Sequence, residues 1–248
     1  MSSIQPNINV DLYKLTPEQM STGNNCNSLS PISLHQLEKE FNSFEQLDIS
    51  DESHRTALAK LFPSYLTEGR DDTDWELFLA MIRYDRQNHT FVTGCFDNKS
   101  ALAFKLISYK HRHKDGIKWK TRVGTSPNST PLVRIYSDDG TIYVVEGHRD
   151  ALTAILIGLD FIMLPYAGFR QTNPIYLQNE VAGKDVVFLI EDQQAYKCMY
   201  AVACKLSDTA KSVRLVDFNN SDKKVDLSDY VCNFNTIEEA RDGLRNLR

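Results

Sequence analysis

Residues 142–152 read IYVVEGHRDAL, and this stretch decides the fold of the chain. Four apolar residues lead into Glu146-Gly147, and apolar residues then recur at helical spacing from Asp150 onward. The same change from an apolar run to a helical pattern follows Val186–Ile190. Apolar strands that alternate with helices are typical of a mostly parallel sheet with helices on both faces, so we predict an α/β fold.

Four regions of the chain differ in their pattern. Residues 1–30 are rich in Ser, Asn, Gln and Pro, which predicts a flexible N-terminal arm. Residues 31–88 carry three helical patterns, the last over 72–86, and residues 89–138 carry short extended runs separated by turn residues. We therefore expect N-terminal helices, then a small mixed α+β, β-rich basic subdomain, and then the α/β domain at 139–248.

The composition excludes several classes of protein. The chain has 248 residues, with 28 Lys and Arg against 33 Asp and Glu, and this net charge of −5 argues against a general binder of polyanions. No two of the five cysteines have the spacing of a zinc ribbon. The sequence shows neither a secretory leader nor a run of about 18 apolar residues, so we expect a cytoplasmic protein that does not enter a membrane.

The charge is distributed unevenly along the chain. Residues 105–134 contain eight basic residues and one acidic residue, a local charge of +7, whereas the remainder carries −12. Aromatic residues interleave with the basic ones, a combination that suits single-stranded DNA because its backbone is negative and its bases stack. The alternative is a strand whose Lys118, Lys120 and Arg122 face solvent while Trp119 packs inward. The predicted nucleic-acid-binding residues are Lys110, Arg112, Lys114, Lys118, Trp119, Lys120, Arg122 and Arg134.

Acidic residues follow both apolar runs of the α/β region. Glu146 ends the first run, and Glu191 and Asp192 follow the second. Because ligands bind where the carboxyl ends of parallel strands converge, we expect these carboxylates to lie together. Clustered carboxylates need a counterion, and a hard divalent cation such as Mg²⁺ or Mn²⁺ prefers oxygen ligands. The alternative is that these acids only cap the next helix or face solvent, Asp150 in particular.

Three motifs in order resemble the Toprim domain, which primases, topoisomerases, recombination proteins and some nucleases share. The first motif is an apolar strand ending in Glu-Gly, with Asp three residues later and then Ala-Leu, all present at 142–152. The second, Asp-x-Asp-x-Ala-Gly, corresponds to residues 191–196, EDQQAY, in which Gln193 replaces the second acid. Residues 224–230, KVDLSDY, resemble the Asp-x-Asn-Asp segment of primase Toprim domains.

The resemblance implies a role for each acid. Neutral Gln193 is a poorer ligand for a hard cation than the carboxylate of the family motif, so the metal site would be weakened. The catalytic residues would be Glu146 and Asp150, and the ligands of Mg²⁺ or Mn²⁺ would be Glu146, Glu191, Asp192 and Asp226.

Basic strands directly before the Toprim motifs are similar to the layout of the catalytic core of bacterial and phage DnaG-type DNA primases. This resemblance implies Mg-dependent nucleotidyl transfer, in which nucleoside triphosphates are joined into an RNA primer on single-stranded DNA during replication of a phage, plasmid or mobile element. The sequence contains no Cys/His zinc module and no Gly-x-x-x-x-Gly-Lys-Ser/Thr loop, so a helicase or other replication protein would act in trans.

Two alternatives to a primase remain open at this point. Gln193 favours a catalytically degenerate Toprim protein that binds nucleic acid or assists another enzyme. The same set of acids also suits a metal-dependent nuclease, because phosphodiester hydrolysis uses the same metal chemistry as nucleotidyl transfer.

Overall fold

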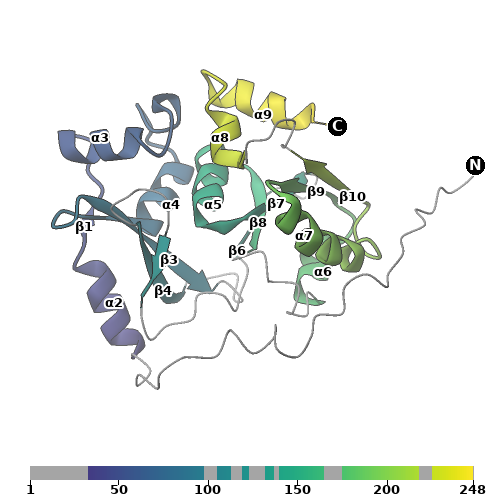
Figure 1. The fold of residues 1–248 in the computed structure, drawn as a ribbon, viewed down its shortest axis with the longest axis horizontal. Helices are drawn as coiled ribbons and strands as arrows, with labels where there is room; N and C mark the ends of the chain where they lie inside the picture. Colours follow the sequence, from purple (N-terminus) through teal and green to yellow (C-terminus); the bar gives the residue numbers. More distant parts are fainter. Residues whose placement is uncertain are drawn as a thin grey trace, which may run out of the picture. The chain divides into compact units, whose positions relative to one another are not determined.

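Figure 1 shows the fold of the protein in a computed structural model. The predicted N-terminal arm at 1–30 lies outside the described residues, and so do Lys114 and Lys118. No helix within the described residues is long and apolar enough to cross a membrane. The structure describes residues 33–97, 105–112, 119–122, 132–136, 140–164, 175–217 and 225–247.

The three N-terminal helices each begin directly after a residue whose side chain caps them. They are α2 (Leu34–Asn42) after Ser33, α3 (Glu52–Ala59) after Asp51, and α4 (Thr73–Met81) after Asp72. Each capping oxygen accepts a hydrogen bond from a backbone N–H of the first turn, which has no partner inside the helix. A short 3-10 turn, η2 (Ser64–Leu66), separates α3 from α4. The three helices expected in this region are therefore present.

The first sheet is antiparallel, with the strand order β1-β2-β3-β4-β5. Its basic strands β4 and β5 belong to the segment expected to form the β-rich subdomain. The strands are β1 (Glu45–Gln46), β2 (Ile82–Asp85), β3 (Thr90–Asp97), β4 (Lys105–Arg112) and β5 (Trp119–Thr121).

The helix predicted over 72–86 ends at Met81, and the prediction is wrong beyond that residue. Ile82–Asp85 forms the strand β2 instead, with all four residues buried. Its pairing with β3 places Ile82 opposite Thr93. The partner strand lies outside the short stretch of sequence in which helical spacing is read. Pairing with this strand outweighs the local spacing of apolar residues. The predicted boundary between the helical region (31–88) and the β-rich subdomain (89–138) therefore falls between β2 and β3, two strands that pair with each other.

The second sheet has the order β10-β9-β7-β8-β6, and only β6 runs antiparallel to its neighbour. This mostly parallel sheet confirms the predicted α/β class. Its strands are β6 (Leu132–Arg134), β7 (Thr141–Glu146), β8 (Asp160–Leu164), β9 (Asp185–Ile190) and β10 (Ser212–Asp217). The helices around it are α5 (Gly147–Leu156), α6 (Ile175–Val181), α7 (Gln193–Leu206), α8 (Leu227–Val231) and α9 (Ile237–Arg245).

Alternate residues of the central strands enter two different hydrophobic clusters. Ile142 and Val144 pack in the cluster that includes residues of α6 and α7. Tyr143 and Val145 pack in the other cluster, with residues of α4, α5, α8 and α9. Because both faces of the sheet are covered, the four buried positions of β7, Ile142–Val145, are all apolar, which is why this part of the sequence is a continuous apolar run and not an alternating one.

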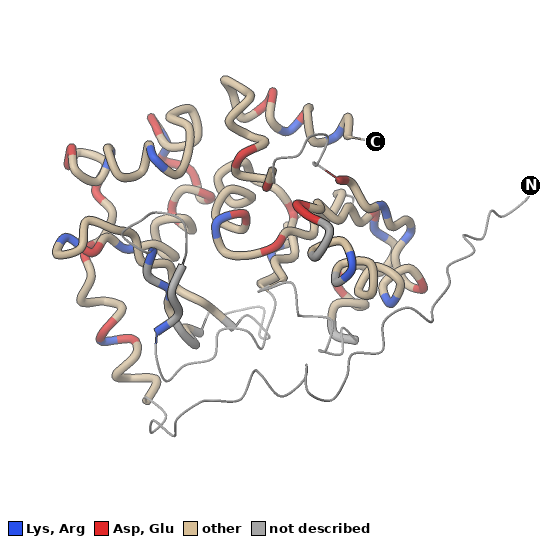
Figure 2. The backbone as a smooth tube through the Cα atoms, viewed as in Figure 1, with Lys and Arg blue, Asp and Glu red and all other residues tan. Residues whose placement is uncertain are grey.

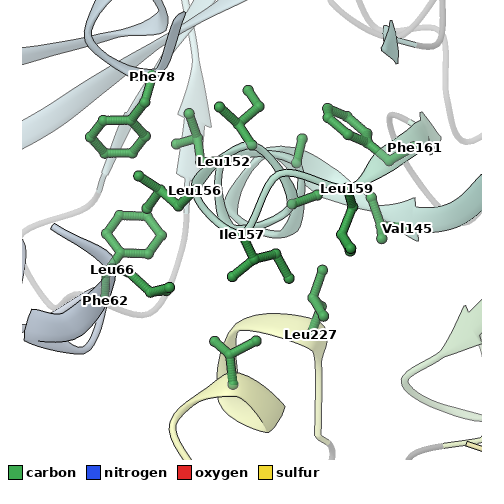
Figure 3. Packing of buried hydrophobic residues seen from close by; sticks show 14 of the residues in the cluster. Phe62, Leu66, Phe78, Val145, Leu152, Leu156, Ile157, Leu159, Phe161 and Leu227 are labelled. Atoms are coloured by element: carbon green, nitrogen blue, oxygen red, sulfur yellow. The ribbon is translucent and has the colours of Figure 1, made fainter. Parts of the chain in front are cut away.

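Helix α5 lies at the centre of the larger cluster, as Figure 3 shows. Leu152 and Leu156 of this helix are fully buried. In the close-up they lie between the aromatic rings of Phe62 and Phe78 on one side and the sheet strand that carries Val145 on the other. Helices α3 and α4 and the parallel sheet therefore share one core, which α5 joins, whereas Leu37 and Phe41 of α2 pack in a separate cluster with residues of β3 and β4.

This central position predicts a large effect of shortening Leu156. Leu156→Ala should lower the free energy of unfolding by about 2–5 kcal/mol, because the substitution leaves a cavity in a closely packed core. Leu34→Ala is the matched control, since Leu34 is 42% exposed, and it should change stability by about 0.5 kcal/mol or less. Urea denaturation measures both variants. Equal losses for the two would contradict the central role of α5.

Candidate functional site

The carboxyl ends of β7 and β9 bring two glutamates to one edge of the sheet. The two strands pair in parallel as far as Val144 opposite Phe188, and Glu146 and Glu191 follow this last pair by two and three residues at the same end of the sheet. Gly147 follows with φ +83, a conformation that side chains other than glycine rarely adopt. A Cβ at this position would meet no atom within 4 Å, so backbone conformation and not space requires the glycine. The turn from strand to helix thereby places Glu146 at the edge.

Asp150 points into the protein and caps a different helix from the one that carries it. Its Oδ1 accepts hydrogen bonds from Ser228 N at 3.1 Å and Ser228 Oγ at 2.9 Å, and its Oδ2 accepts one from Leu227 N at 3.3 Å. These donors belong to the first turn of α8. At 4% exposure, Asp150 is a buried structural partner of α8. The sequence left open that Asp150 only caps its own helix, whereas the structure shows it bound to the first turn of α8. Its catalytic role stays a prediction.

The raised pKa of Asp150 shows that other carboxyl groups lie close to it. Burial raises this pKa well above its ordinary value, and the negative charges of Asp226 and Glu191 raise it further. Three carboxyl groups from α5, β9 and α8 therefore lie within electrostatic range of one another. Figure 2 shows the acidic segments at the starts of α7 and α8 around the beginning of α5.

The acids of the second motif have different environments. Glu191 directly follows β9 and is 7% exposed. Asp192 caps α7, and its Oδ1 accepts a hydrogen bond from Ala195 N at 2.7 Å. Asp192 thus has the capping role that the sequence left open as an alternative. Gln193 is the first residue of α7, and its side chain lies outside the described part of the structure.

Arg149 neutralises the acids of the third segment, and sequence reasoning did not single it out. Its Nη1 lies 3.3 Å from Asp226 Oδ2 and its Nη2 lies 3.1 Å from Asp229 Oδ1. Asp226 Oδ1 also accepts a hydrogen bond from Asp229 N at 2.8 Å, as the cap of α8. Both carboxylate oxygens of Asp226 therefore have partners within the protein, and its role as a metal ligand stays a prediction. The only sequence signal was a basic residue directly before the motif aspartate.

The carboxylates of Glu146 and Glu191 fit a divalent cation in one particular mode. Within the described residues, no three His, Cys, Asp or Glu side chains are placed to hold a metal ion among themselves. Mg²⁺, however, is usually bound through one or two carboxylates, with water and substrate phosphates completing its shell. Glu146 and Glu191 supply two hard oxygen donors at adjacent strand ends. They fit Mg²⁺ or Mn²⁺ in this mode, whereas a cage made only of protein ligands does not fit.

Two basic residues of β4 lie within electrostatic range of the start of α5. Burial, and next the positive charge of Lys110, lower the pKa of His148 to about 3. Burial, and next the positive charge of Arg149, lower the pKa of Arg112. Lys110 and Arg112 therefore lie within electrostatic range of the first motif. Part of the basic segment thus lies near the edge of the sheet at which β7 and β9 end in Glu146 and Glu191, which we call the acidic edge.

Two of the predicted DNA-binding residues, Arg122 and Arg134, have partners within the protein. Arg122 forms an ion pair with Glu40, with 2.8 Å between Nε and Oε2. Arg134 is 6% exposed, pairs with Asp74, and donates from Nη1 to the Leu159 carbonyl at 2.8 Å. Burial and pairing thus give both arginines structural contacts that the local charge pattern could not reveal. The backbones of Trp119 and Lys120 lie in β5, while their side chains are outside the described part of the structure.

Comparison with known proteins identifies the architecture. No protein-family model and no curated protein matches the chain. A solved structure of the DnaG catalytic core aligns over 85% of this chain and 80% of its own length, with 15% identity and a TM-score of 0.52. The chain has the fold of the DnaG primase catalytic core. A DnaG primase catalytic domain bound to single-stranded DNA also shares this primase-core fold, over 86% of this chain and 78% of its own, with 11% identity and a TM-score of 0.52.

The buried Asp150 predicts a particular dependence of stability on pH in metal-free buffer. Because its pKa is raised in the folded state, the folded protein keeps this proton at pH values where the unfolded chain has lost it. Wild-type stability therefore falls as pH rises from about 4 through the raised pKa. Asp150→Asn has no such proton, so its stability relative to wild type should increase over this range and then level off. Urea denaturation at a series of pH values measures this, and a constant difference would contradict the prediction.

Proposed function

We propose that the protein is a primase-like nucleotidyltransferase that uses single-stranded DNA as template and nucleoside triphosphates as substrates. One observation carries this proposal: Glu146 and Glu191 lie at adjacent strand ends, beside basic residues of β4, within a primase-core fold. Polymerisation needs this combination, because carboxylates hold the metal ions and positive charge holds the template.

Each part of the edge has a separate task in this proposal. A divalent cation held by Glu146 and Glu191 would supply positive charge to the reacting phosphate. Glu146 is half-exposed at the turn, where it can contact this cation or accept the proton of the attacking hydroxyl; both roles need its carboxylate. Lys110 and Arg112 bring positive charge to the border of the edge, where the backbone of a template strand would lie.

The proposed setting is replication of a phage, plasmid or other mobile element in the cytoplasm. A helicase or other replication protein would act together with this chain in that setting. A non-catalytic accessory role is the second candidate. The neutral Gln193 and the engagement of Asp226 with Arg149 favour it, since both reduce the acids left for metal.

Primer synthesis tests the catalytic proposal directly. Purified protein should make short RNA products on single-stranded DNA with nucleoside triphosphates and Mg²⁺ or Mn²⁺. Glu146→Gln should lower the rate by about 10²-fold or more, because it removes a charged group from the reacting edge. Glu180→Gln, an exposed change on α6, is the matched control and should leave the rate unchanged.

The same assay separates the alternatives. Absence of primers together with retained binding of single-stranded DNA would overturn the enzyme in favour of the accessory protein. Metal-dependent shortening of the DNA that Glu146→Gln abolishes would identify a nuclease. A rate unaffected by Glu146→Gln would show that the acidic edge is not the reaction centre.

Template binding should depend steeply on salt concentration. Lys118→Ala and Lys120→Ala should each weaken binding of single-stranded DNA and reduce the slope of log affinity against log salt by about 0.7, because each removes one positive charge that neutralises a phosphate. Lys211→Ala is the control, because Lys211 pairs with Asp185 at the amino end of β9, away from the acidic edge. Fluorescence anisotropy of a labelled oligonucleotide measures these affinities. Binding that is independent of salt would contradict the prediction.

A further inference from the structure

A cavity of about 680 Å³ lies at the amino ends of β7 and β8, at the end of the sheet opposite to the acidic edge. Thr141 and Asp160, the first residues of these two strands, line it together with residues that follow β6, precede β8 or belong to α9. We propose that this cavity binds a nucleotide, with its base stacked on Tyr136 and its phosphates held by Arg241 and Arg245. The inference goes beyond the proposed function and does not depend on the acidic edge.

Tyr136 offers the cavity an aromatic surface. Its side chain lines the cavity and is 64% exposed. The guanidinium carbon of Arg134 lies 3.9 Å from the centre of the ring, and Asp160 Oδ1 accepts a hydrogen bond from Tyr136 N at 2.8 Å. The ring is therefore held on one face while most of it stays accessible. A planar base can stack on such a ring, whichever base it is.

Arg134 supports this ring and is not available to a ligand. It forms an ion pair with Asp74 and donates from Nη1 to the Leu159 carbonyl at 2.8 Å. Its charge and that of Asp74 therefore neutralise each other. The positive charge offered to a ligand must come from other residues of the cavity.

Arg241 and Arg245 of α9 supply that charge. Arg241 Nε donates to the Ile157 carbonyl at 2.6 Å, which orients the guanidinium, and within the described residues Arg241 has no acidic partner. A Cβ at Gly158 would clash with Arg241 Nη2, so the glycine leaves the space that the guanidinium occupies. Arg245 pairs with Asp242, but these two side chains are 69% and 67% exposed, and such surface pairs are weak. Guanidinium groups bind phosphate oxygens well because two N–H groups can donate in parallel.

Tyr143 adds a hydroxyl donor to the inner wall of the cavity. Its ring is buried, and burial raises the pKa of its hydroxyl, whereas the positive charges of Arg245 and Arg214 act in the opposite direction. Both arginines therefore lie within electrostatic range of this hydroxyl, which stays protonated at neutral pH. Asp160 keeps a negative charge at the cavity, but Arg214 and Arg241 have no acidic partner within the described residues and outweigh it.

The position and size of the cavity make it a second site and not a part of the acidic edge. Strand β7 runs from Thr141 to Glu146, so its two ends are about 16 Å apart. The volume falls within the range of about 300–1,000 Å³ that is typical of sites for small molecules. A nucleotide bound here would be a ligand of the protein and not the reacting substrate of the acidic edge.

Isothermal titration calorimetry of the full chain with adenosine diphosphate, in metal-free buffer, tests this inference. The wild type should bind the nucleotide at a single site. Tyr136→Ala should weaken binding by about tenfold or more because the base loses its stacking surface, and Tyr136→Phe should bind like the wild type. Arg241→Met and Arg245→Met should each weaken binding by about tenfold, because each removes charge-assisted hydrogen bonds to phosphate.

Two exposed residues elsewhere in the chain provide matched controls. Tyr196→Ala removes an exposed ring from α7, and Arg55→Met removes an exposed guanidinium from α3. Neither residue lines the cavity, so both variants should bind like the wild type. The urea denaturation midpoint of each variant verifies that it is folded. Arg245 is largely exposed, so Arg245→Met keeps the test valid if Arg241→Met does not fold.

Inorganic pyrophosphate and adenosine probe the two halves of the ligand separately. Each should bind at least about tenfold more weakly than adenosine diphosphate, because each makes only part of the contacts. Pyrophosphate that binds as strongly as the nucleotide, with no effect of Tyr136→Ala, would overturn the inference in favour of a simple phosphate site. Nucleotide binding that is unchanged in Tyr136→Ala and Arg245→Met, or no binding at all, would also overturn it. Primer synthesis is measured separately, so none of these results decides the proposed function.

Discussion

The hydrogen bonds between the buried Asp150 carboxylate and the first turn of α8 are the contact on which the candidate site depends. They connect the first motif to the third segment, 77 and 78 residues away along the chain. A buried carboxylate without partners would be costly, so α8 is held where it satisfies Asp150. This placement in turn brings Asp226 and Asp229 to Arg149.

Helix α5 connects this contact to the hydrophobic core. Its polar start supplies Arg149 and Asp150 to the edge, while its apolar body packs between the α3–α4 region and the parallel sheet. Residues of this region, such as Phe62 and Phe78, thus cover the face of α5 that the sheet leaves open (Figure 3). Lys110 and Arg112 of β4, whose apolar residues pack in a separate cluster, lie within electrostatic range of the start of α5, so basic and acidic groups lie near one another.

Sequence predicted the parts of this arrangement that depend on local pattern. The apolar runs of β7 and β9, the acids that end them and the mostly parallel sheet all follow from periodicity and from the strand-to-helix turn at Gly147. The parts that were missed depend on partners far along the chain. Arg134 pairs with Asp74, 60 residues away, and Arg122 pairs with Glu40, 82 residues away. A count of basic residues in a segment cannot reveal such partners, nor can it reveal the pairing that makes Ile82–Asp85 a strand.

The measurement that tests the account most directly is a crystal structure of the full chain with Mn²⁺, a nucleoside triphosphate and single-stranded DNA, in which the metal is located by its anomalous scattering. The account predicts an ion at about 2.0–2.2 Å from carboxylate oxygens of both Glu146 and Glu191. The DNA backbone should lie beside β4. An ion bound away from Glu146 and Glu191, or DNA bound on a surface away from β4 and the acidic edge, would contradict it.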